Sequence, residues 1–401
     1  MGRKYCSGGE EGYNRSIFMV LIDIGQNKNW KKERREEMKK VLLILLALIM
    51  VFSFAACGGG ETVEEGGEAP VLKVGFIYIG VINDGGYTQA HHEGTMAMEE
   101  HFDGQVETAY IEGVDDSDKQ ASLNAALNLI DQGCNVVIAT SYGFMDALDE
   151  LANSGDYDDV YFFHFSGNKS NDTNFENYFG AIEDPRYLSG MVAGSMTESN
   201  LLGYVAAYPY TEVNIGINAF TLGAQSVNPD VEVKVVYINS WYDPEKERAA
   251  GDELVAAGCD VIAQHCDTTG PQVAAAEGGG YAIGYNYPNN VAPEAFLTAP
   301  IWHHDVYLID RIQKILDGTF TPENYYGTLA EGYVGLAEMT DLVPQEVQDL
   351  VMAKKAEIEQ GEFFPFSGYI EYNDGTVMCE EGQVMTVAEI WQITGLVKGA
   401  K

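Results

Sequence analysis

A glycine-rich turn between residues 75 and 94 carries side chains that suit ligand binding. An aromatic ring such as that of Tyr87 can stack on a flat ligand, and a carboxylate such as that of Asp84 accepts hydrogen bonds from ligand N–H groups. Residues 74–79 form an apolar run of strand length, and a helical pattern starts at Thr88. A strand, a tight turn and a helix start form the junction at which α/β proteins bind small ligands. The alternative is an ordinary first strand-to-helix turn without a ligand.

The same combination of rings and acids recurs in the loops that we expect at the carboxyl ends of the other strands. These loops carry the rings of Tyr87, Tyr142, Phe144, Tyr208, Trp241, Tyr242 and Tyr285 and the carboxylates of Asp84, Asp243 and Asp267. None of them contains Lys or Arg, so a phosphate or carboxylate ligand would be held poorly. The composition favours an uncharged planar heterocycle with hydrogen-bond donors, such as a purine. A sugar is the competing ligand, and Phe144 and Tyr208 are expected to fill the core instead.

A short internal sequence repeat predicts the strands and helices that position these loops. Residues 133–139 (GCNVVIA) and 258–263 (GCDVIA) each follow a predicted helix, and Gly133 and Gly258 stand where that helix would end. Residues 201–207 likewise resemble the opening strand. Two similar halves predict an α/β protein of two Rossmann-like lobes with parallel sheets, joined by hinge strands and enclosing a ligand cleft.

The N-terminal region has the features of an export signal. Residues 38–56 begin with a basic pair, continue with an apolar run and end in small residues before Cys57. The run is shorter than the roughly 20 residues that a plain transmembrane anchor requires, and the residues Phe-Ala-Ala before Cys57 resemble a bacterial lipobox. We expect residues 1–37 to be an upstream artefact, Cys57 to be lipidated on the outer face of the bacterial cell membrane, and residues 57–70 to form an acidic tether.

The charge balance restricts the partners. The chain has 61 acidic and 23 basic residues, a net charge of −38, and residues 1–40 hold 10 of the basic residues but only 6 of the acidic ones. Such an acidic surface repels nucleic acid and anionic membranes, which excludes both as partners of the folded part. The length predicts two domains. We expect the first lobe to span residues 71–185 with part of 300–330, and the second to span 186–299 and 331–401.

Other chemistry is poorly supported. The glycine-rich turn lacks the G-x-G-x-x-G and G-x-x-x-x-G-K spacings, so no nucleotide cofactor is expected, and no nucleophile elbow is present. Two His-His pairs, at residues 91–92 and 303–304, form weak metal-ligand pairs because adjacent helical residues point apart. The acidic residues 115–118 read as a helix start, and residues 366–378 as a β-hairpin. Cys259 and Cys266 could form a disulfide, although their spacing does not require it.

Several motifs resemble the basic membrane protein family of solute-binding lipoproteins. They are Asp84-Gly-Gly-Tyr-Thr with His91 and Gly94, Tyr187–Gly194, Gly216–Pro229, Ser240–Lys246 and Gln264–Asp267. The resemblance covers residue 71 to the end and implies the fold of type I periplasmic binding proteins. It also implies that the chain serves an ABC importer for purine nucleosides or nucleobases, with permease and ATPase subunits as partners.

The resemblance also implies roles for individual residues. In that family two aromatic rings hold the purine, at positions matching Tyr87 and Trp241, and the matching acids are Asp84 and Asp267. Nucleoside-binding members carry a Lys where this chain has Trp302, and Trp there is typical of the nucleobase branch. Together with the loop composition, this predicts ligand contacts from Asp84, Tyr87, Tyr142, Trp241, Asp243, Asp267, Asn286 and Trp302.

The sequence thus predicts a lipid-anchored receptor that captures a purine, with an adenine-like nucleobase favoured, and no catalysis. Two alternatives remain open, an extracytoplasmic enzyme acting on nucleosides and a receptor for a sugar or signal molecule.

Overall fold

The structure, a computed structural model, describes residues 71–401, which belong to one compact unit. The predicted artefact, signal peptide, tether and lipidation site Cys57 lie outside the described residues. No helix between residues 71 and 401 combines the length and the apolar character that a membrane span requires.

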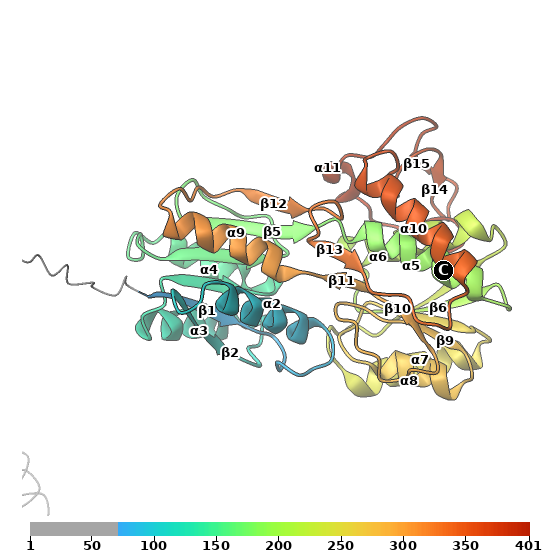
Figure 1. The fold of residues 1–401 in the computed structure, drawn as a ribbon, viewed down its shortest axis with the longest axis horizontal. Helices are drawn as coiled ribbons and strands as arrows, with labels where there is room; N and C mark the ends of the chain where they lie inside the picture. Colours follow the sequence, from blue (N-terminus) through green and yellow to red (C-terminus); the bar gives the residue numbers. More distant parts are fainter. Residues whose placement is uncertain (1–70) are drawn as a thin grey trace, which may run out of the picture. The chain divides into compact units, whose positions relative to one another are not determined.

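The first sheet has six parallel strands in the order β12-β5-β4-β3-β1-β2 (Figure 1). The strands are β1 (Leu72–Ile77), β2 (Val106–Ile111), β3 (Val136–Ala139), β4 (Tyr161–Phe165), β5 (Phe175–Gly180) and β12 (Asn324–Gly327). All four residues of β3 are buried, which explains its continuous apolar sequence. The helices of this lobe are α2 (Tyr87–His101), α3 (Lys119–Asp131), α4 (Met145–Ala152) and α9 (His304–Leu316). Helix α2 packs beside α9, and α3 packs beside α4.

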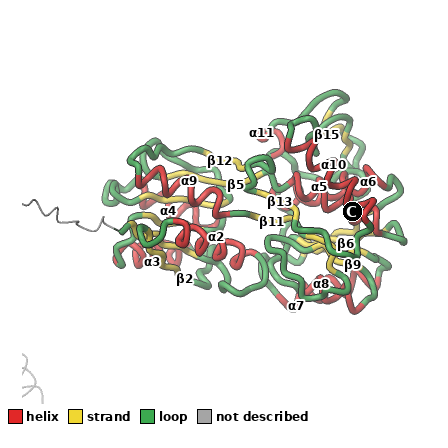
Figure 2. Tube along the Cα trace, in the orientation of Figure 1, coloured by secondary structure: helices red, strands yellow, loops and turns green. Residues whose placement is uncertain are grey.

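The second sheet has five parallel strands in the order β10-β9-β8-β6-β7. They are β6 (Leu201–Ala206), β7 (Glu232–Tyr237), β8 (Val261–Gln264), β9 (Tyr281–Ile283) and β10 (Phe296–Thr298). Its helices are α5 (Glu183–Met196), α6 (Thr211–Val227), α7 (Pro244–Ala256) and α8 (Gly270–Glu277). Helices α5 and α6 pack on one side of this sheet, and α7 and α8 on the other (Figures 1 and 2).

The strand order confirms the two similar halves that the internal sequence repeat predicts. In the first sheet β1 lies between β2 and β3, and in the second sheet β6 lies between β7 and β8 in the same way. Gly133 and Gly258 follow α3 and α7 with φ of +90° and +93°, the left-handed conformation that ends a helix at little cost only for glycine. The predicted α/β fold with two parallel sheets is therefore confirmed.

Three segments connect the two lobes. The chain passes from β5 into α5, from β10 through β11 (Pro300–Trp302) into α9, and from β12 through β13 (Val334–Leu336) toward α10 (Gln345–Glu359). Strands β11 and β13 pair antiparallel with each other between the two large sheets (Figure 1). Residues 304–327 thus return to the first lobe before the chain ends on the second.

The C-terminal segment packs on the second lobe. Strands β14 (Ile370–Glu371) and β15 (Val377–Cys379) form the predicted hairpin and are followed by α11 (Val387–Ile390). Side-chain nitrogens of α6 bind backbone carbonyls of this segment, with Asn218 Nδ2 2.9 Å from the oxygen of Gly395. The four cysteines of the described part are free, so the structure contains no Cys259–Cys266 disulfide.

The acidic residues 115–118 behave as predicted, because Asp118 caps α3. Its carboxylate accepts from the backbone N–H groups of Gln120 and Ala121, at 2.9 and 3.3 Å. We expect Asp118→Ala to lower the free energy of unfolding by about 1 kcal/mol, the usual cost of losing an N-cap. Urea denaturation measures this difference. Asp131→Ala, at the other end of the same helix, serves as a matched control, since an acid there opposes the helix dipole and its removal costs nothing. Equal losses in both variants would contradict the capping role.

Candidate functional site

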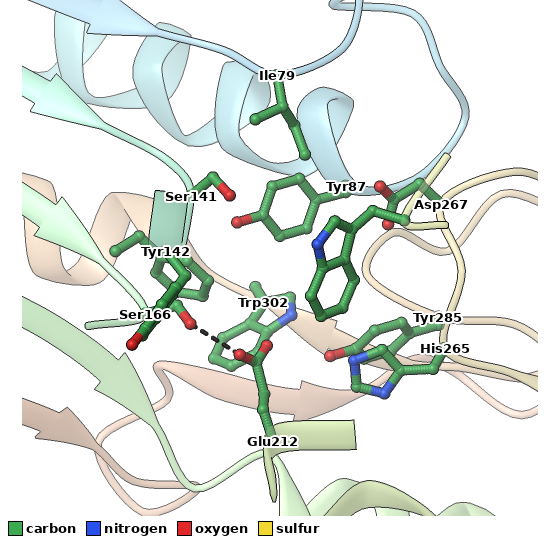
Figure 3. Close-up of a pocket in the computed structure, with 12 residues that line it drawn as sticks. Ile79, Tyr87, Ser141, Tyr142, Ser166, Glu212, His265, Asp267, Tyr285 and Trp302 are labelled. Carbon is green, nitrogen blue, oxygen red and sulfur yellow. Dashed lines mark hydrogen bonds between the residues drawn. The ribbon is translucent and has the colours of Figure 1, made fainter. Parts of the chain in front are cut away.

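A pocket lies between the two lobes, where loops from both sheets meet. The empty space between its lining atoms, including the part that opens toward solvent, is about 420 Å³. Twelve residues line it: Ile79, Tyr87, Ser141, Tyr142, Phe165, Ser166, Glu212, Trp241, His265, Asp267, Tyr285 and Trp302 (Figure 3). The carboxyl ends of β3, β4, β6, β8 and β9 supply most of them, as expected for parallel sheets.

Six of the lining residues are aromatic and come from both lobes. Tyr87, Tyr142 and Phe165 belong to the first lobe, Trp241 and Tyr285 to the second, and Trp302 to the connecting strand β11. The indole of Trp241 lines the pocket and lies with its ring centroid 6.2 Å from that of His265. Tyr142 is 56% exposed and forms the rim. The arrangement suits a flat ring inserted between the lobes.

The pocket contains two carboxylates and no lysine or arginine among its lining residues. Asp267 is buried, and burial together with the nearby acids, Asp84 foremost, raises the pKa of its carboxyl well above the usual range. Burial also raises the pKa of Glu212 to about 7. A carboxyl group keeps an acceptor oxygen in either protonation state, so both groups can accept hydrogen bonds from ligand N–H or amine donors, whereas no cation lines the pocket to hold an anionic ligand.

Two of the predicted contacts, Asp84 and Asp243, do not line the pocket and instead cap helices. The Asp84 carboxylate accepts from the backbone N–H groups of Gly86, Thr88 and Gln89 at 2.8–3.0 Å, at the start of α2. Asp243 caps α7 and accepts from the backbone N–H of Lys246 at 3.0 Å. These bonds direct both carboxylates toward helix starts, and direct ligand contact from these two acids stays a prediction.

Asn286 lies behind the pocket and positions two residues that line it. Its Oδ1 accepts from the indole N–H of Trp302 at 3.1 Å, and its Nδ2 lies 3.5 Å from Oδ1 of Asp267. Asn286 itself is 1% exposed. The structure therefore brings Tyr87, Tyr142, Trp241, Asp267 and Trp302 together around the pocket, with Asn286 as support.

The lobes touch across the pocket. Ser166 of the first lobe donates to Oε2 of Glu212 of the second lobe at 2.8 Å (Figure 3), and Asn289 Nδ2 lies 3.3 Å from the carbonyl oxygen of Gly85. A Cβ atom at Gly86 would lie 2.1 Å from the backbone oxygen of Asp267, far inside contact distance. The structure is thus a closed conformation, and only glycine permits this approach of α2 to the second lobe.

The raised pKa of Glu212 predicts a pH effect on the ligand-free protein. A carboxyl whose folded-state pKa is about 7, against 4.5 in its unperturbed state, binds its proton more tightly in the folded state. Its contribution to stability is complete below about 4.5 and is lost as the pH rises through about 7. We expect Glu212→Gln to flatten the fall in unfolding free energy over this range, measured by urea denaturation at a series of pH values. Glu245→Gln, on the exposed face of α7, is the control and should leave the slope unchanged; equal slopes in wild type and Glu212→Gln would contradict the assignment.

One histidine of each His-His pair packs against a histidine of the other pair. Across residues 71–401 no group of three or more His, Cys, Asp or Glu is arranged to hold a metal ion. The rings of His91 and His304 stack with centroids 3.7 Å apart, and burial lowers the pKa of His91 to about 3. They serve as buried aromatic packing at the junction of α2 and α9.

Comparison with known families adds to this geometry. The family model described as "ABC transporter substrate-binding protein PnrA-like" matches residues 71–363. The chain belongs to this family. As a member it is an ABC transporter substrate-binding protein, and the resemblance to the basic membrane protein family is confirmed.

Two relatives of this substrate-binding protein carry different ligands in their names. A purine-binding protein of Brucella abortus is 37% identical over 78% of this chain and 88% of its own length. A protein of Haloferax volcanii is named as a putative ABC transporter glucose-binding protein. It is 35% identical over 77% of this chain and 78% of its own length. Both names describe binding proteins rather than enzymes.

Solved structures support the fold of the substrate-binding protein. An ABC transporter solute-binding protein from Aeropyrum pernix superimposes with a TM-score of 0.63 over 75% of this chain and 93% of its own, at 16% identity. One from Conexibacter woesei gives 0.60 over 73% and 98%, at 20% identity.

Several lining residues were not among the ligand contacts predicted from the sequence. His265 and Tyr285 follow β8 and β9, and Glu212 lies in the first turn of α6; the strand-end rule places these segments at the cleft, but each segment offers several candidates. Phe165 ends β4 and Ser166 follows it, and the sequence pattern had not identified this strand. Phe144 is fully buried in the core, as predicted, and Tyr208 is half-buried, stacked on Tyr210 with centroids 5.0 Å apart.

Proposed function

We propose that this substrate-binding protein captures a purine nucleobase, with adenine-like bases favoured, and delivers it to the permease of an ABC importer. The observation that carries the proposal is the composition of the pocket lining, which contains six aromatic rings and two carboxylates but no lysine or arginine. Such a site stacks on a flat uncharged ring and accepts its N–H donors. The purine-binding relative from Brucella abortus supports the same ligand class.

In this proposal Tyr87, Tyr142, Trp241 and Trp302 contact the ring, and Asp267 and Glu212 accept from its edge. Trp302 occupies the place of a ribose-contacting Lys in nucleoside-binding relatives, which favours a base over a nucleoside. The two lobes would close about β11, β13 and the β5–α5 connection and so enclose the bound ligand. The protein would be anchored through lipidated Cys57 at the outer face of the bacterial cell membrane and would work with permease and ATPase subunits.

A sugar is the second candidate ligand, because the Haloferax volcanii relative is named for glucose and because aromatic rings with acids also hold sugars. Isothermal titration calorimetry of the purified protein against adenine, guanosine, glucose and ribose separates the candidates. We expect adenine to bind most tightly. Binding of glucose alone would replace the proposal, and turnover of inosine or adenosine would indicate an enzyme.

A further inference from the structure

Arg186 is a buried cation directly behind the pocket. It lies on α5 with 0% exposure, and its guanidinium carbon is 3.5 Å from the ring centre of Tyr285. Arg311, the other fully buried arginine of the described part, pairs with Glu176, whereas no carboxylate among residues 71–401 forms an ion pair with Arg186. Burying a charge without a counter-charge is costly. Two residues that Arg186 does contact, His265 and Tyr285, line the pocket.

One of these contacts restricts the protonation of His265. Nη1 of Arg186 donates to the carbonyl oxygen of Gln264 at 2.7 Å, and Nη2 lies 3.4 Å from Nδ1 of His265. A guanidinium has only donors and stays charged in proteins. Nδ1 must therefore act as the acceptor, which leaves the ring proton on Nε2. Burial and the charge of Arg186 lower the pKa of His265 well below its usual value, so the ring is neutral.

The remaining nitrogen of His265 is open to the pocket. In the described part, Nε2 of His91 and Nε2 of His304 are fully buried and have no hydrogen-bond partner. Nε2 of His265 does not belong to this group of enclosed nitrogens. No hydrogen bond from Nε2 of His265 to another residue of the described chain is present, and His265 lines the cavity (Figure 3). An N–H at this position is free to donate to a ligand.

We propose that Arg186 is a positioning residue that fixes His265 as its Nε2–H tautomer, so that the pocket presents a ring N–H donor to a lone pair of the ligand. This inference rests on the proposed function and narrows its ligand class. The ligand carries N–H donors for Asp267 and Glu212 and, in addition, an acceptor for His265, such as an unprotonated ring nitrogen or a carbonyl oxygen. The competing explanation is that Arg186 only packs on Tyr285 through a cation–π contact, which sets no tautomer.

Long-range ¹H–¹⁵N correlation spectra of the ligand-free protein test the tautomer without any ligand. The signals of His265 are those lost in His265→Asn. We expect an unprotonated Nδ1 and a protonated Nε2 in the wild type, a mixture of tautomers in Arg186→Met and in Arg186→Lys, and no change in Tyr204→Phe, which alters the other ring near the guanidinium. A protonated Nδ1 in the wild type overturns the proposal, and this result does not depend on whether the Arg186 variants fold.

Calorimetry with adenine and its 1-, 3- and 7-deaza analogues tests the donor role. Each analogue lacks one ring acceptor, and we expect one of them to bind the wild type about tenfold more weakly than adenine, as for the loss of one hydrogen bond. His265→Phe should bind that analogue and adenine equally. Equal binding of all analogues to the wild type overturns the donor role, whereas absence of binding to every purine overturns the proposed function and leaves the spectroscopic result standing.

Discussion

Trp241→Ala is expected to weaken purine binding by about 1–3 kcal/mol, which is the usual contribution of one base stacked on an aromatic ring and corresponds to roughly 5- to 150-fold in Kd. The indole lines the pocket, as the ring of Tyr87 does, and its ring centroid is 5.3 Å from that of Tyr208. Removing it leaves one face of the ligand without a partner. Calorimetry with adenine measures the loss, and circular dichroism verifies that the variant is folded.

Two variants define what the Trp241 result means. Trp241→Phe keeps a ring in place and should retain most of the affinity. Tyr242→Ala removes the neighbouring ring, which is 44% exposed and does not line the pocket, and should change nothing. Full affinity of Trp241→Ala for every purine would show that the ring does not contact the ligand.

Arg311→Met is expected to lower the free energy of unfolding by about 3–5 kcal/mol, because it leaves a buried carboxylate uncompensated. Glu176 is 0% exposed, and it accepts from Nε of Arg311 at 2.7 Å and from the backbone N–H of Glu323 at 3.0 Å. Burial raises the pKa of Glu176 even with the arginine beside it. Urea denaturation measures the change.

The surface of the same helix offers a matched control for Arg311. Lys314 pairs with Asp310 one turn away, with both side chains well exposed, and such pairs contribute at most about 1 kcal/mol. Lys314→Met should therefore have a small effect. In the double variant with Glu176→Gln, part of the loss caused by Arg311→Met should be recovered, since the unpaired charge is gone. A loss no larger than that of Lys314→Met would contradict the importance of the buried pair.

The sheets and cleft loops could be predicted because parallel strands are marked locally. The runs before Tyr142 and His265 are continuously apolar, and Gly133 and Gly258 mark helix ends by a conformation that other residues avoid. The strand-end rule then places the following loops at the cleft without knowledge of any long-range contact. Most of the aromatic lining was reached in this way.

The acids could not be assigned from the same signals. A short carboxylate just before a helix suits both a ligand contact and an N-cap, and Asp84 and Asp243 proved to be caps. For Asp243 a signal was present, since Pro244 at the first helical position is typical of a cap-and-helix start. Other contacts depend on tertiary structure alone: Glu176 and Arg311 are 135 residues apart, and only the fold brings them together.

The pairing of β5 with β12 has a consequence for the order in which the protein is made. Asn177 pairs with Asn324 across a separation of 147 residues, so the outer edge of the first sheet stays open until all five strands of the second sheet have been synthesised. An open strand edge is a template for pairing with other chains, and closing so long a loop is slow. In a nascent or partly exported chain, the edge of β5 therefore stays unpaired until residues 324–327 are available. A chain truncated before these residues has an aggregation-prone first lobe.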